Sequence, residues 1–341
     1  MNKVAVVILT WNGCAMLKKF LPSVIEYSEG EGVEVYVADN DSKDDTVAML
    51  KKDFPYIQLV LLDKNYGFAD GYNRALQKIE AKYVVLLNSD VEIKNRWLEP
   101  LVDYMDMHPE VAACQPKILS FRSPQLFEYA GASGGFIDCY GYPFCRGRIF
   151  KTIERDARQY DQPTSIFWAT GAALFIRLED YRGVGGLDGS FFAHMEEIDL
   201  CWRLHSRGRS IVCIPQSVVY HVGGATLKRE NPMKTLLNFR NNLIMLYKNI
   251  PDDKALEKIM RVRRFWDVVA ALSFFAKGHY SNAMAVFKAR RQFLERLHRY
   301  DEARKENKSK SKQSVILEQF PHSILMEYFF FRRRKFSRLR W

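Results

Sequence analysis

The chain has 341 residues, of which 48% are hydrophobic and 27% charged. These values fit a large α/β domain with an appendage, or two domains, and exclude a fibrous or disordered protein. The net charge of +11 is confined to the C-terminal part: residues 252–341 hold 22 Lys and Arg against 10 Asp and Glu, which leaves 29 against 30 in residues 1–251. A basic terminal segment favours an anionic partner, such as lipid head groups, nucleic acid or an acidic subunit. The plain alternative is a solvated helix surface.

Neither the cysteines nor the N-terminus indicates a secreted or zinc-binding protein. The six cysteines are scattered without CxxC spacing, so no zinc site is expected. The apolar run at residues 4–9 leads into polar Thr10-Trp-Asn-Gly13 without a small-residue cleavage site, so we interpret it as a buried strand rather than a signal peptide. No apolar stretch reaches the ~18–20 residues that span a bilayer. We therefore expect a cytoplasmic protein with free thiols.

Apolar runs and helical patterns alternate over the first 90 or so residues of the chain. Strands are predicted at 4–9, 33–38, 57–62 and 83–87, and helices at 15–28, from about 44, and at 69–79. This order predicts a doubly wound, mostly parallel sheet, whose ligands bind beyond the carboxyl ends of the strands. Polar clusters at 10–13, 39–42 and 88–90 all fall at that edge.

The rest of the chain is less regular. Residues 111–186 are rich in Gly and aromatic residues. We expect a loop entering a buried strand at 167–176, a short helix at 196–207, a strand at 211–214 and helices from 232 onward. The Lys-rich segment 302–313 is predicted to be a mobile linker.

Two motifs are candidates for binding a metal ion. Asn88-Ser89-Asp90 follows a buried strand, where a carboxylate can hold a divalent cation that also binds a diphosphate. A polar strand end is common, so the triplet alone proves little. His221, in Tyr220-His-Val-Gly-Gly-Ala-Thr226, could ligate the same metal or contact phosphate, although a lone His is more often structural.

Two further motifs are candidates for binding a nucleotide. Asp39, in Asp39-Asn-Asp-Ser42, could accept the imino N–H of a pyrimidine, or the segment could simply form a turn. In the segment from Asn65 to Arg74, Gly67 and Gly71 allow close approach of a ligand. Asn73 and Arg74 are expected near a helix start, which favours anions. A plain glycine loop is the alternative, and no GxxxxGK[ST] motif is present.

Three carboxylates stand within four residues: Glu196, Glu197 and Asp199. On a helix, Ile198, Cys201, Trp202 and His205 would form the buried stripe below them. Crowded like charges raise a carboxyl pKa toward the range of a general base. The alternative is an acidic helix start stabilised by the helix dipole.

In order and spacing these segments resemble the family 2 glycosyltransferases of the GT-A fold, in particular the rhamnosyltransferase-like subgroup of bacterial surface-polysaccharide synthesis. The resemblance runs from Val4 to about Lys248 and is carried by Thr10-Trp-Asn, Asp39-Asn-Asp-Ser, Asn65-Tyr-Gly-Phe-Ala-Asp-Gly-Tyr-Asn-Arg, Asn88-Ser-Asp, Gly171-Ala-Ala, Glu196-Glu-Ile-Asp-Leu-Cys-Trp-Arg and His221-Val-Gly-Gly. It implies a GT-A (Rossmann-like) doubly wound mixed sheet in a catalytic domain over 1–250. Residues 1–110 would form the nucleotide-binding half, 111–250 the acceptor-side half, and 251–341 a basic helical C-terminal extension.

The resemblance also implies a chemistry: inverting transfer of a sugar from a nucleoside-diphosphate-sugar to a hydroxyl of a glycan acceptor, which would be lipid-linked. UDP- or dTDP-sugars are the favoured donors, with GDP-sugars as an alternative. The residues implied at the donor are Thr10, Asn12, Asp39, Asn65, Gly67, Asn73, Arg74, Asn88 and Ser89.

A divalent metal, Mg²⁺ or Mn²⁺, would be bound by Asp90, with His221 supporting the metal or the diphosphate. The first Asp of the family's metal motif is Asn88 here. The family's general base is the Asp of a Glu-Asp pair, and that position is Glu197 here. The assignment therefore stays open among Glu197, Glu196 and Asp199, and we favour Glu197.

Basic and aromatic residues alternate in the tail, at 261–299 and again at 324–341. This pattern is typical of a helix on an anionic membrane, so we expect a peripheral protein on the inner face of the cell membrane. The alternatives are helices packed on the catalytic domain and an oligomer interface. Nucleic-acid binding is not expected, because no recognised module is present.

Other functions stay open. A processive synthase would need spanning helices and a QxxRW motif, and neither is visible. A nucleotide-sugar nucleotidyltransferase would need a Gly-rich basic loop after the first strand, which Thr10-Trp-Asn-Gly13 is not. A catalytically inactive scaffold is the remaining alternative, against which the carboxylates at 90 and 196–199 argue.

Overall fold

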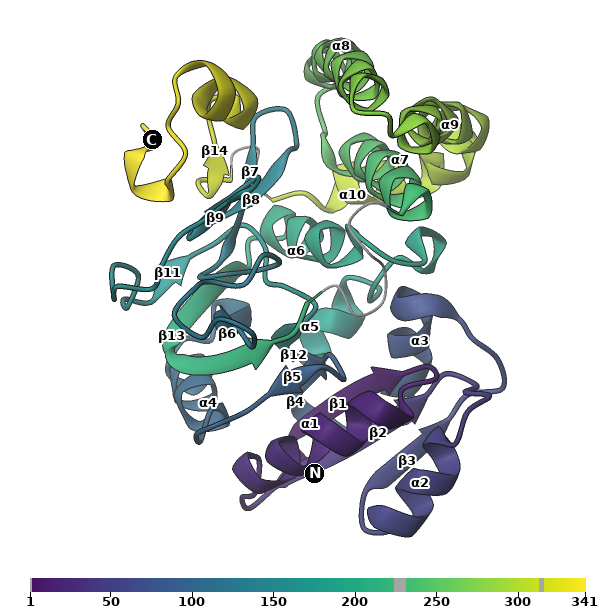
Figure 1. The fold of residues 1–341 in the computed structure, drawn as a ribbon, viewed down its shortest axis with the longest axis vertical. Helices are drawn as coiled ribbons and strands as arrows, with labels where there is room; N and C mark the ends of the chain where they lie inside the picture. The colour runs from purple at the N-terminus through teal and green to yellow at the C-terminus, as the bar shows by residue number, and fades with distance from the viewer. Residues whose placement is uncertain (1, 224–230, 313–315) are drawn as a thin grey trace.

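The computed structural model describes residues 2–223, 231–312 and 316–341. Its first part alternates strands and helices as predicted, and Figure 1 shows these purple and blue elements gathered at one end of the molecule. They are β1 (Asn2–Thr10), α1 (Cys14–Tyr27), β2 (Val33–Asp39), α2 (Thr46–Asp53), β3 (Gln58–Leu61), α3 (Gly67–Leu76) and β4 (Ala81–Leu87). The strands run parallel in the order β4, β1, β2, β3, so their carboxyl ends share one edge.

β1 is buried on both faces, as its continuous apolar run predicts. Its side chains from Val4 to Ile8 are at most 1% exposed. Ala5 and Val7 pack into one hydrophobic cluster, whereas Val4, Val6 and Ile8 pack into a second cluster, because successive side chains of a strand point to opposite faces. Burial on both faces makes β1 a rigid base for the loop that follows it.

The sheet continues with elements from the middle of the chain. These are β5 (Val91–Glu92), α4 (Leu98–Met107), β6 (Val111–Ser120), β11 (Thr164–Ser165), β12 (Ala173–Arg177), α5 (Leu178–Gly183), α6 (Glu196–Ser206) and β13 (Ser210–His221). In the described part of the chain the sheet has nine strands. The pairings make β1 to β4, β6 and β13 run one way, and β5, β11 and β12 the other. The predicted mixed, mostly parallel α/β fold is confirmed.

A second, five-stranded sheet joins the middle of the chain to its C-terminal end. It consists of β7 (Gly135–Asp138), β8 (Pro143–Cys145), β9 (Arg148–Ile149), β10 (Thr152–Ile153) and β14 (Gln319–Phe320). β14 pairs parallel with β7, and the ring of Phe136 lies 5.0 Å from Phe336 and 5.2 Å from Trp341. The last residues therefore return to the body of the protein rather than extending from it.

Four helices cover the end opposite β1 to β3: α7 (Pro232–Asn249), α8 (Asp253–Ala276), α9 (Tyr280–Arg296) and α10 (Asp301–Lys310), as Figure 1 shows. The predicted helical C-terminal region is confirmed. The division at residue 250 stays a prediction, although Leu256, Phe293 and Tyr300 belong to the same hydrophobic cluster as Leu243 and Ile250. None of the described helices is long and apolar enough to cross a membrane.

The prediction of a mobile linker at 302–313 is wrong for the residues that the structure describes. Residues 301–310 form α10, which is held by the buried Arg304. The Arg304 guanidinium donates to the carbonyls of Tyr247 and Ile250, the latter at 2.7 Å, and pairs with Asp253 at 2.7 Å. Polarity alone suggested disorder, but one buried cation that satisfies carbonyls at the end of α7 orders the segment.

We expect Arg304→Ala to lower the free energy of unfolding by about 2 kcal/mol, because it leaves buried carbonyls without a charged donor. The neighbouring Lys305→Ala serves as a control: its side chain is 73% exposed, so it should change stability by less than about 0.5 kcal/mol. Urea denaturation of both variants measures the difference. Equal values would mean that α10 is not anchored through Arg304.

Candidate active site

The ends of β1 and β2 bring together two buried oxygens that lack hydrogen-bond partners. The strand register pairs Thr10 with Asp39, and the two residues are only 4% and 3% exposed. Among the described residues, neither Thr10 Oγ1 nor Asp39 Oδ1 has a partner, whereas Asp39 Oδ2 accepts from the Ser42 amide at 3.0 Å. Buried polar atoms are nearly always paired, so these two oxygens indicate a place for a ligand with a hydrogen-bond donor.

The loops around this position are tied together by asparagines. Asn12 has φ 51°; its amide donates to Ser42 Oγ at 2.8 Å, and its side-chain oxygen accepts from the Lys43 amide at 2.7 Å. Asn65 Oδ1 accepts from Asn40 Nδ2 at 3.1 Å and from the Gly67 amide at 2.8 Å. Asn12 and Asn65 therefore shape the loops that surround Thr10 and Asp39.

The expectation that Asn73 and Arg74 lie near a helix start is wrong. α3 begins at Gly67 and ends at Leu76, so both residues are in its last turns. Asn73 donates to the Leu187 carbonyl at 2.7 Å and accepts from Tyr181 Oη at 2.6 Å. Arg74 is exposed and pairs with Asp70 at 2.9 Å. The apolar pattern correctly predicted a helix here. Its predicted start at residue 69 lies two residues after the observed start, and Asn73 and Arg74 lie in the second half of the helix rather than near its beginning.

The amino end of α3 meets the loop that precedes α6. At Gly67, φ is +74°, and an added Cβ would lie 2.5 Å from the ring of Phe192, so only glycine fits. The Phe192 carbonyl accepts from the amides of Phe68 at 2.9 Å and Ala69 at 3.5 Å. These first-turn donors are thus occupied by the protein itself rather than left for a phosphate.

Asp90 and His221 form a buried pair although 131 residues separate them. Asp90 follows β4, and the pairing of Val91 in β5 with His221 in β13 sets the two side by side. His221 Nε2 lies 3.1 Å from Asp90 Oδ1 and 3.3 Å from Asn88 Nδ2. Burial by itself lowers the pKa of an imidazole, but the carboxylates of Asp90 and Glu128 raise the pKa of His221 to about 10.

Glu128 is a residue that the sequence analysis missed. It is 6% exposed, and its Oε2 lies 3.6 Å from the other imidazole nitrogen, His221 Nδ1. Its carboxylate also accepts from the Ala130 amide, which fixes its position. A carboxylate behind a ligating histidine is the usual device for orienting the ring. No motif surrounds Glu128, so only the fold could reveal it.

The donor set at Asp90 fits a hard divalent cation that is shared with a substrate. No group of three or more His, Cys, Asp or Glu side chains within the described ranges could hold a metal by itself. Mg²⁺ and Mn²⁺ do not need one, because they take one or two protein ligands and complete their coordination with phosphate oxygens and water. Ser89 is half-buried beside the pair. Residues 224–226 of the predicted motif lie outside the described residues.

Glu196 and Glu197 open α6, and each has a carboxyl oxygen without a partner among the described residues. Burial raises the pKa of Glu196 well above its ordinary range, and the adjacent Glu197 raises it further. Burial also raises the pKa of Glu197, to about 7. The side chains differ in burial: Glu196 is 4% exposed, whereas Glu197 is half-buried, although its unpartnered Oε2 is buried.

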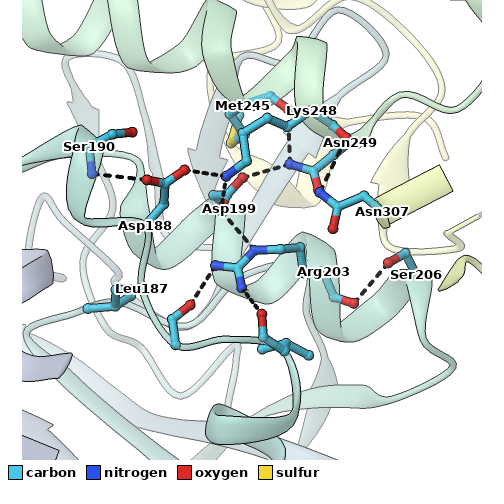
Figure 2. Close-up of polar contacts among 12 residues, drawn as sticks. Leu187, Asp188, Ser190, Asp199, Arg203, Ser206, Met245, Lys248, Asn249 and Asn307 are labelled. Atoms are coloured by element: carbon cyan, nitrogen blue, oxygen red, sulfur yellow. Dashed lines mark hydrogen bonds and ion pairs between the residues drawn. The ribbon is translucent and has the colours of Figure 1, made fainter. Parts of the chain in front are cut away.

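Asp199 has a different environment, which Figure 2 shows. It is fully buried. Its carboxylate pairs with Arg203 at 2.9 Å and Lys248 at 3.0 Å, and it accepts from Asn249 Nδ2 at 2.7 Å. Although burial by itself raises the pKa of a carboxyl, these cations lower the pKa of Asp199 below its ordinary value. The predicted stripe of Ile198, Cys201, Trp202 and His205 is buried, but the helix is buried on nearly every side.

The loop before α6 is strained, and Asn241 makes most of the side-chain hydrogen bonds that hold it. Phe192, His194 and Met195 have φ of 65°, 71° and 74°, a region that costs non-glycine residues energy. Asn241 Nδ2 of α7 donates to the carbonyls of Phe191, Ala193 and His194 at 3.0, 2.9 and 2.8 Å. Asn241 was not predicted from the sequence, although two consecutive asparagines directly before the apolar run at residues 243–246 were a usable signal.

The segment 169–172 connects the Asp90 region to α6. The Ala172 carbonyl accepts from the Asn88 amide at 3.0 Å, and the Ala169 amide lies 3.5 Å from Cys201 Sγ. This segment thus joins the region of the Asp90–His221 pair to α6, while the ends of β1 and β2 share the carboxyl edge of the sheet with β4, which Asp90 follows. In doubly wound folds, this edge is where a nucleotide and the group that it carries are bound.

The arrangement places the protein among the α/β transferases that use a nucleotide-activated donor. Residues 5–178, just over half of the chain, match the family described as glycosyl transferase family 2. The chain belongs to this family and is a glycosyltransferase.

Individual proteins support the same class. The N-acetylglucosaminyl-diphospho-decaprenol L-rhamnosyltransferase of Mycobacterium tuberculosis is 27% identical over 259 residues, 71% of this chain and 83% of that protein. Mannosyltransferase PcManGT from Pyrobaculum calidifontis, in complex with GDP-Man and Mn²⁺, has a TM-score of 0.52 at 15% identity, over 90% of this chain and 84% of its own. GalNAc-T7 with UDP, GalNAc and Mn²⁺ has a TM-score of 0.57 at 15% identity, over 72% and 48%. At such identities the structures establish the fold alone, and they confirm the GT-A class.

Asp199→Ala should lower the free energy of unfolding by about 3–5 kcal/mol, because it leaves buried cations without their shared partner. Since the pKa of Asp199 is lowered by folding, its contribution is present at neutral pH and is lost as the pH falls below about 4. Urea titrations between neutral and acidic pH measure both effects. Glu179→Ala, an exposed carboxylate on α5, is the control. A variant with wild-type stability but no transfer would instead assign Asp199 to catalysis.

Proposed function

We propose that the protein is an inverting glycosyltransferase that moves a sugar, of the rhamnosyl or hexosyl type, from a UDP- or dTDP-sugar to a hydroxyl of a lipid-linked glycan. The observation that carries the proposal is the set of buried, unpartnered polar atoms at Thr10, Asp39, Glu196 and Glu197. They lie where the sheet edge, the Asp90–His221 pair and α6 meet, and each lacks a partner that a substrate would supply.

The donor base would bind at the ends of β1 and β2. Asp39 Oδ1 is free to accept the imino N–H of uracil or thymine, and Thr10 Oγ1 stands next to it in the strand register. Asn12, Asn65 and Gly67 would shape the surrounding loops. Asn73 and Arg74 would not bind phosphate at a helix start. They would support the donor site indirectly, through the contacts that hold α3 in place. Guanine also carries an imino N–H, so GDP-sugars are the competing donor class.

The diphosphate would lie against Asn88, Ser89 and Asp90, with a divalent metal held by Asp90. His221, whose pKa of about 10 keeps the imidazole protonated without metal, would contact the diphosphate as a cation or release a proton to bind the metal. The bound metal would neutralise the charge that develops on the leaving nucleoside diphosphate. PcManGT and GalNAc-T7 hold Mn²⁺ together with a nucleotide or nucleotide-sugar on the same fold, which supports this assignment. Glu128 would keep the His221 ring in the orientation that presents Nε2.

Glu197 would act as the general base. Its carboxylate would take the proton of the acceptor hydroxyl, and the hydroxyl oxygen would attack the anomeric carbon from the face opposite the departing diphosphate, so the configuration would invert. A pKa of about 7 suits a base that works at neutral pH. Glu196, whose pKa is raised further, would stay protonated beside it, and Asp199 would hold α6 in place through Arg203 and Lys248.

A lipid-linked acceptor is supported by the mycobacterial relative, whose name describes transfer to a glycan on a diphospho-decaprenol carrier. A lipid carrier requires the enzyme to work at a membrane surface, and we propose that it does so on the inner face. The basic C-terminal residues are consistent with that location, and the residues that face the membrane are argued in the next subsection.

Donor binding is tested by thermal shift and calorimetry with UDP, dTDP and GDP, each with and without Mn²⁺ or Mg²⁺. We expect one pyrimidine nucleotide with metal to stabilise the protein, since a ligand of the folded state raises stability with its concentration. Asp90→Ala should abolish the metal-dependent part, and Glu128→Gln should weaken apparent metal affinity by about 10–100-fold. Glu92→Gln, a neighbouring carboxylate that pairs with Lys94, is the control. Binding of no nucleotide at all would favour an inactive scaffold.

Glu197→Gln should lower kcat about 10²–10⁴-fold while leaving donor binding intact. Glu196→Gln mimics a protonated carboxyl and should keep activity within about tenfold of wild type. Because the base must be deprotonated, kcat/KM should rise with pH through an apparent pKa of about 7, a value that belongs to the coupled pair. A steady-state pH profile measures this. The reverse ranking of the two variants would make Glu196 the base.

A further inference from the structure

The helices α8 and α9 form a hairpin whose outer face is apolar. Large hydrophobic side chains that belong to no core are exposed on it: Phe265, Val268, Val269, Leu272, Phe275, Tyr280, Met284, Phe287 and Leu294, at 38–66% exposure. Two hollows of about 440 and 430 Å³ are lined by most of these side chains, the first together with the charged Arg264, Asp267 and Arg290. A contiguous apolar surface of this kind marks an interaction site.

The face is presented by a rigid hairpin rather than by loosely packed helices. Asp267 of α8, 1% exposed, pairs with Arg290 of α9 at 2.5 Å. Ala271 and Val286 are buried where the two helices meet, and they line the hollows together with the exposed apolar side chains. The two helices are therefore joined by a buried ion pair and by apolar contacts, and the exposed apolar side chains lie around this junction.

The exposed side of α8 changes character along its length. In its first half the exposed residues are charged: Asp253, Lys254, Glu257, Lys258, Arg261 and Arg264. From Phe265 to Ala276 no exposed residue is charged, and the turn at Lys277–His279 then leads into Tyr280 of α9. The apolar surface is thus concentrated toward the tip of the hairpin, with charge at its border.

The border is basic. Arg264, Lys277, Lys288 and Arg291 are exposed around the apolar residues. Arg291 pairs with Glu295 at 3.0 Å, but in the described part of the chain no ion pair neutralises Arg264, Lys277 or Lys288. Apolar side chains with unneutralised cations at their border suit the surface of an anionic bilayer. The apolar side chains can contact the acyl chains, and the cations can contact the lipid phosphates.

We propose that this tip of the α8–α9 hairpin is a membrane-docking surface that inserts its apolar side chains among anionic lipids. A second copy of the chain is the less suitable occupant, because a two-fold contact through the same face would bring the unneutralised cations of both borders together. This inference rests on the proposed function, in which a lipid-linked acceptor requires a membrane. Docking itself requires neither the sugar donor nor the acceptor.

The docked hairpin would lie one helix away from the proposed base. α9 packs on α7, where Asn282 donates to Thr235 at 2.7 Å and Ala285 and Ala289 pack against Leu236 and Leu237. α7 in turn holds the loop before Glu196 through Asn241. Figure 1 shows the hairpin at the end opposite β1 to β3, with α6 between them. Docking would thus turn the acceptor side toward the membrane and leave the nucleotide side toward the solvent.

The test measures flotation of the full chain with phosphatidylcholine vesicles that contain either no anionic lipid or about 30 mol% phosphatidylglycerol. The double variant Leu272→Glu/Phe275→Glu removes apolar contacts, and Lys277→Glu/Lys288→Glu reverses the border charge. Tyr56→Glu, which introduces the same charge at a side chain 65% exposed on the nucleotide half, is the control. Thermal melting confirms that every variant folds.

Wild type and Tyr56→Glu should bind the anionic vesicles, and each double variant should bind them at least about tenfold more weakly. Absence of wild-type binding, or binding unchanged in the double variants, would overturn the proposal. So would a wild-type dimer in sedimentation equilibrium that Leu272→Glu/Phe275→Glu dissociates, because a second copy would then occupy the face. Nucleotide binding is measured separately without vesicles. Loss of nucleotide binding would contradict the proposed function, whereas loss of vesicle binding would contradict only the docking proposal.

Discussion

The buried carboxylate of Asp199 is the interaction on which the arrangement of the acceptor side depends. It neutralises Arg203 from its own helix and Lys248 from α7, and Arg203 then donates to the carbonyls of Val184 at 2.6 Å and Gly186 at 2.7 Å. Asn249 links the same carboxylate to Asn307 of α10 at 3.2 Å. One charge therefore fixes α6 against the loop after α5, the end of α7 and the C-terminal helices. Because breaking a buried pair is costly, these parts keep one arrangement.

That fixed frame explains how the protein can keep two neighbouring glutamates in a buried position. Glu196 and Glu197 have no cation of their own in the described part of the chain, and their buried oxygens are unpaired, which costs stability. The helix that carries them would move to relieve this cost if it were free. Asp199, three residues on, instead holds α6 from its buried side, and Asn241 holds the strained loop in front of it. The buried ion pairs of Asp199 thus offset the cost of burying the two unpaired glutamate oxygens.

The sequence was informative where local pattern and fold agree. Continuous apolar runs placed β1 and β4, a segment rich in valine placed β2, and polar residues directly after these strands placed Thr10, Asp39 and Asp90 at one edge. Asn73 and Arg74 were misplaced because apolar periodicity locates a helix but not its first residue. The segment at 302–313 looked disordered because its polarity does not reveal that Arg304 meets carbonyls from the end of α7. Glu128 and Asn241 act only through partners distant in the chain, and a single sequence carries no record of such contacts.

The exposed apolar face of the α8–α9 hairpin is joined to the acceptor side through α7. Transfer to a soluble acceptor would not require an exposed apolar face, and such a face is a liability in solution because it favours aggregation. In the described part of the chain, Leu272, Phe275 and Met284 nevertheless lie outside every core, while Asp267 and Arg290 join the same two helices through a buried ion pair. An acceptor fixed in a bilayer presents its hydroxyl at a set height above the lipid surface. Under this proposal, a rigid path from the hairpin through α7 to the loop before α6 would hold the proposed base at a matching height, and the packing of the C-terminal helices would determine which acceptors the enzyme can reach.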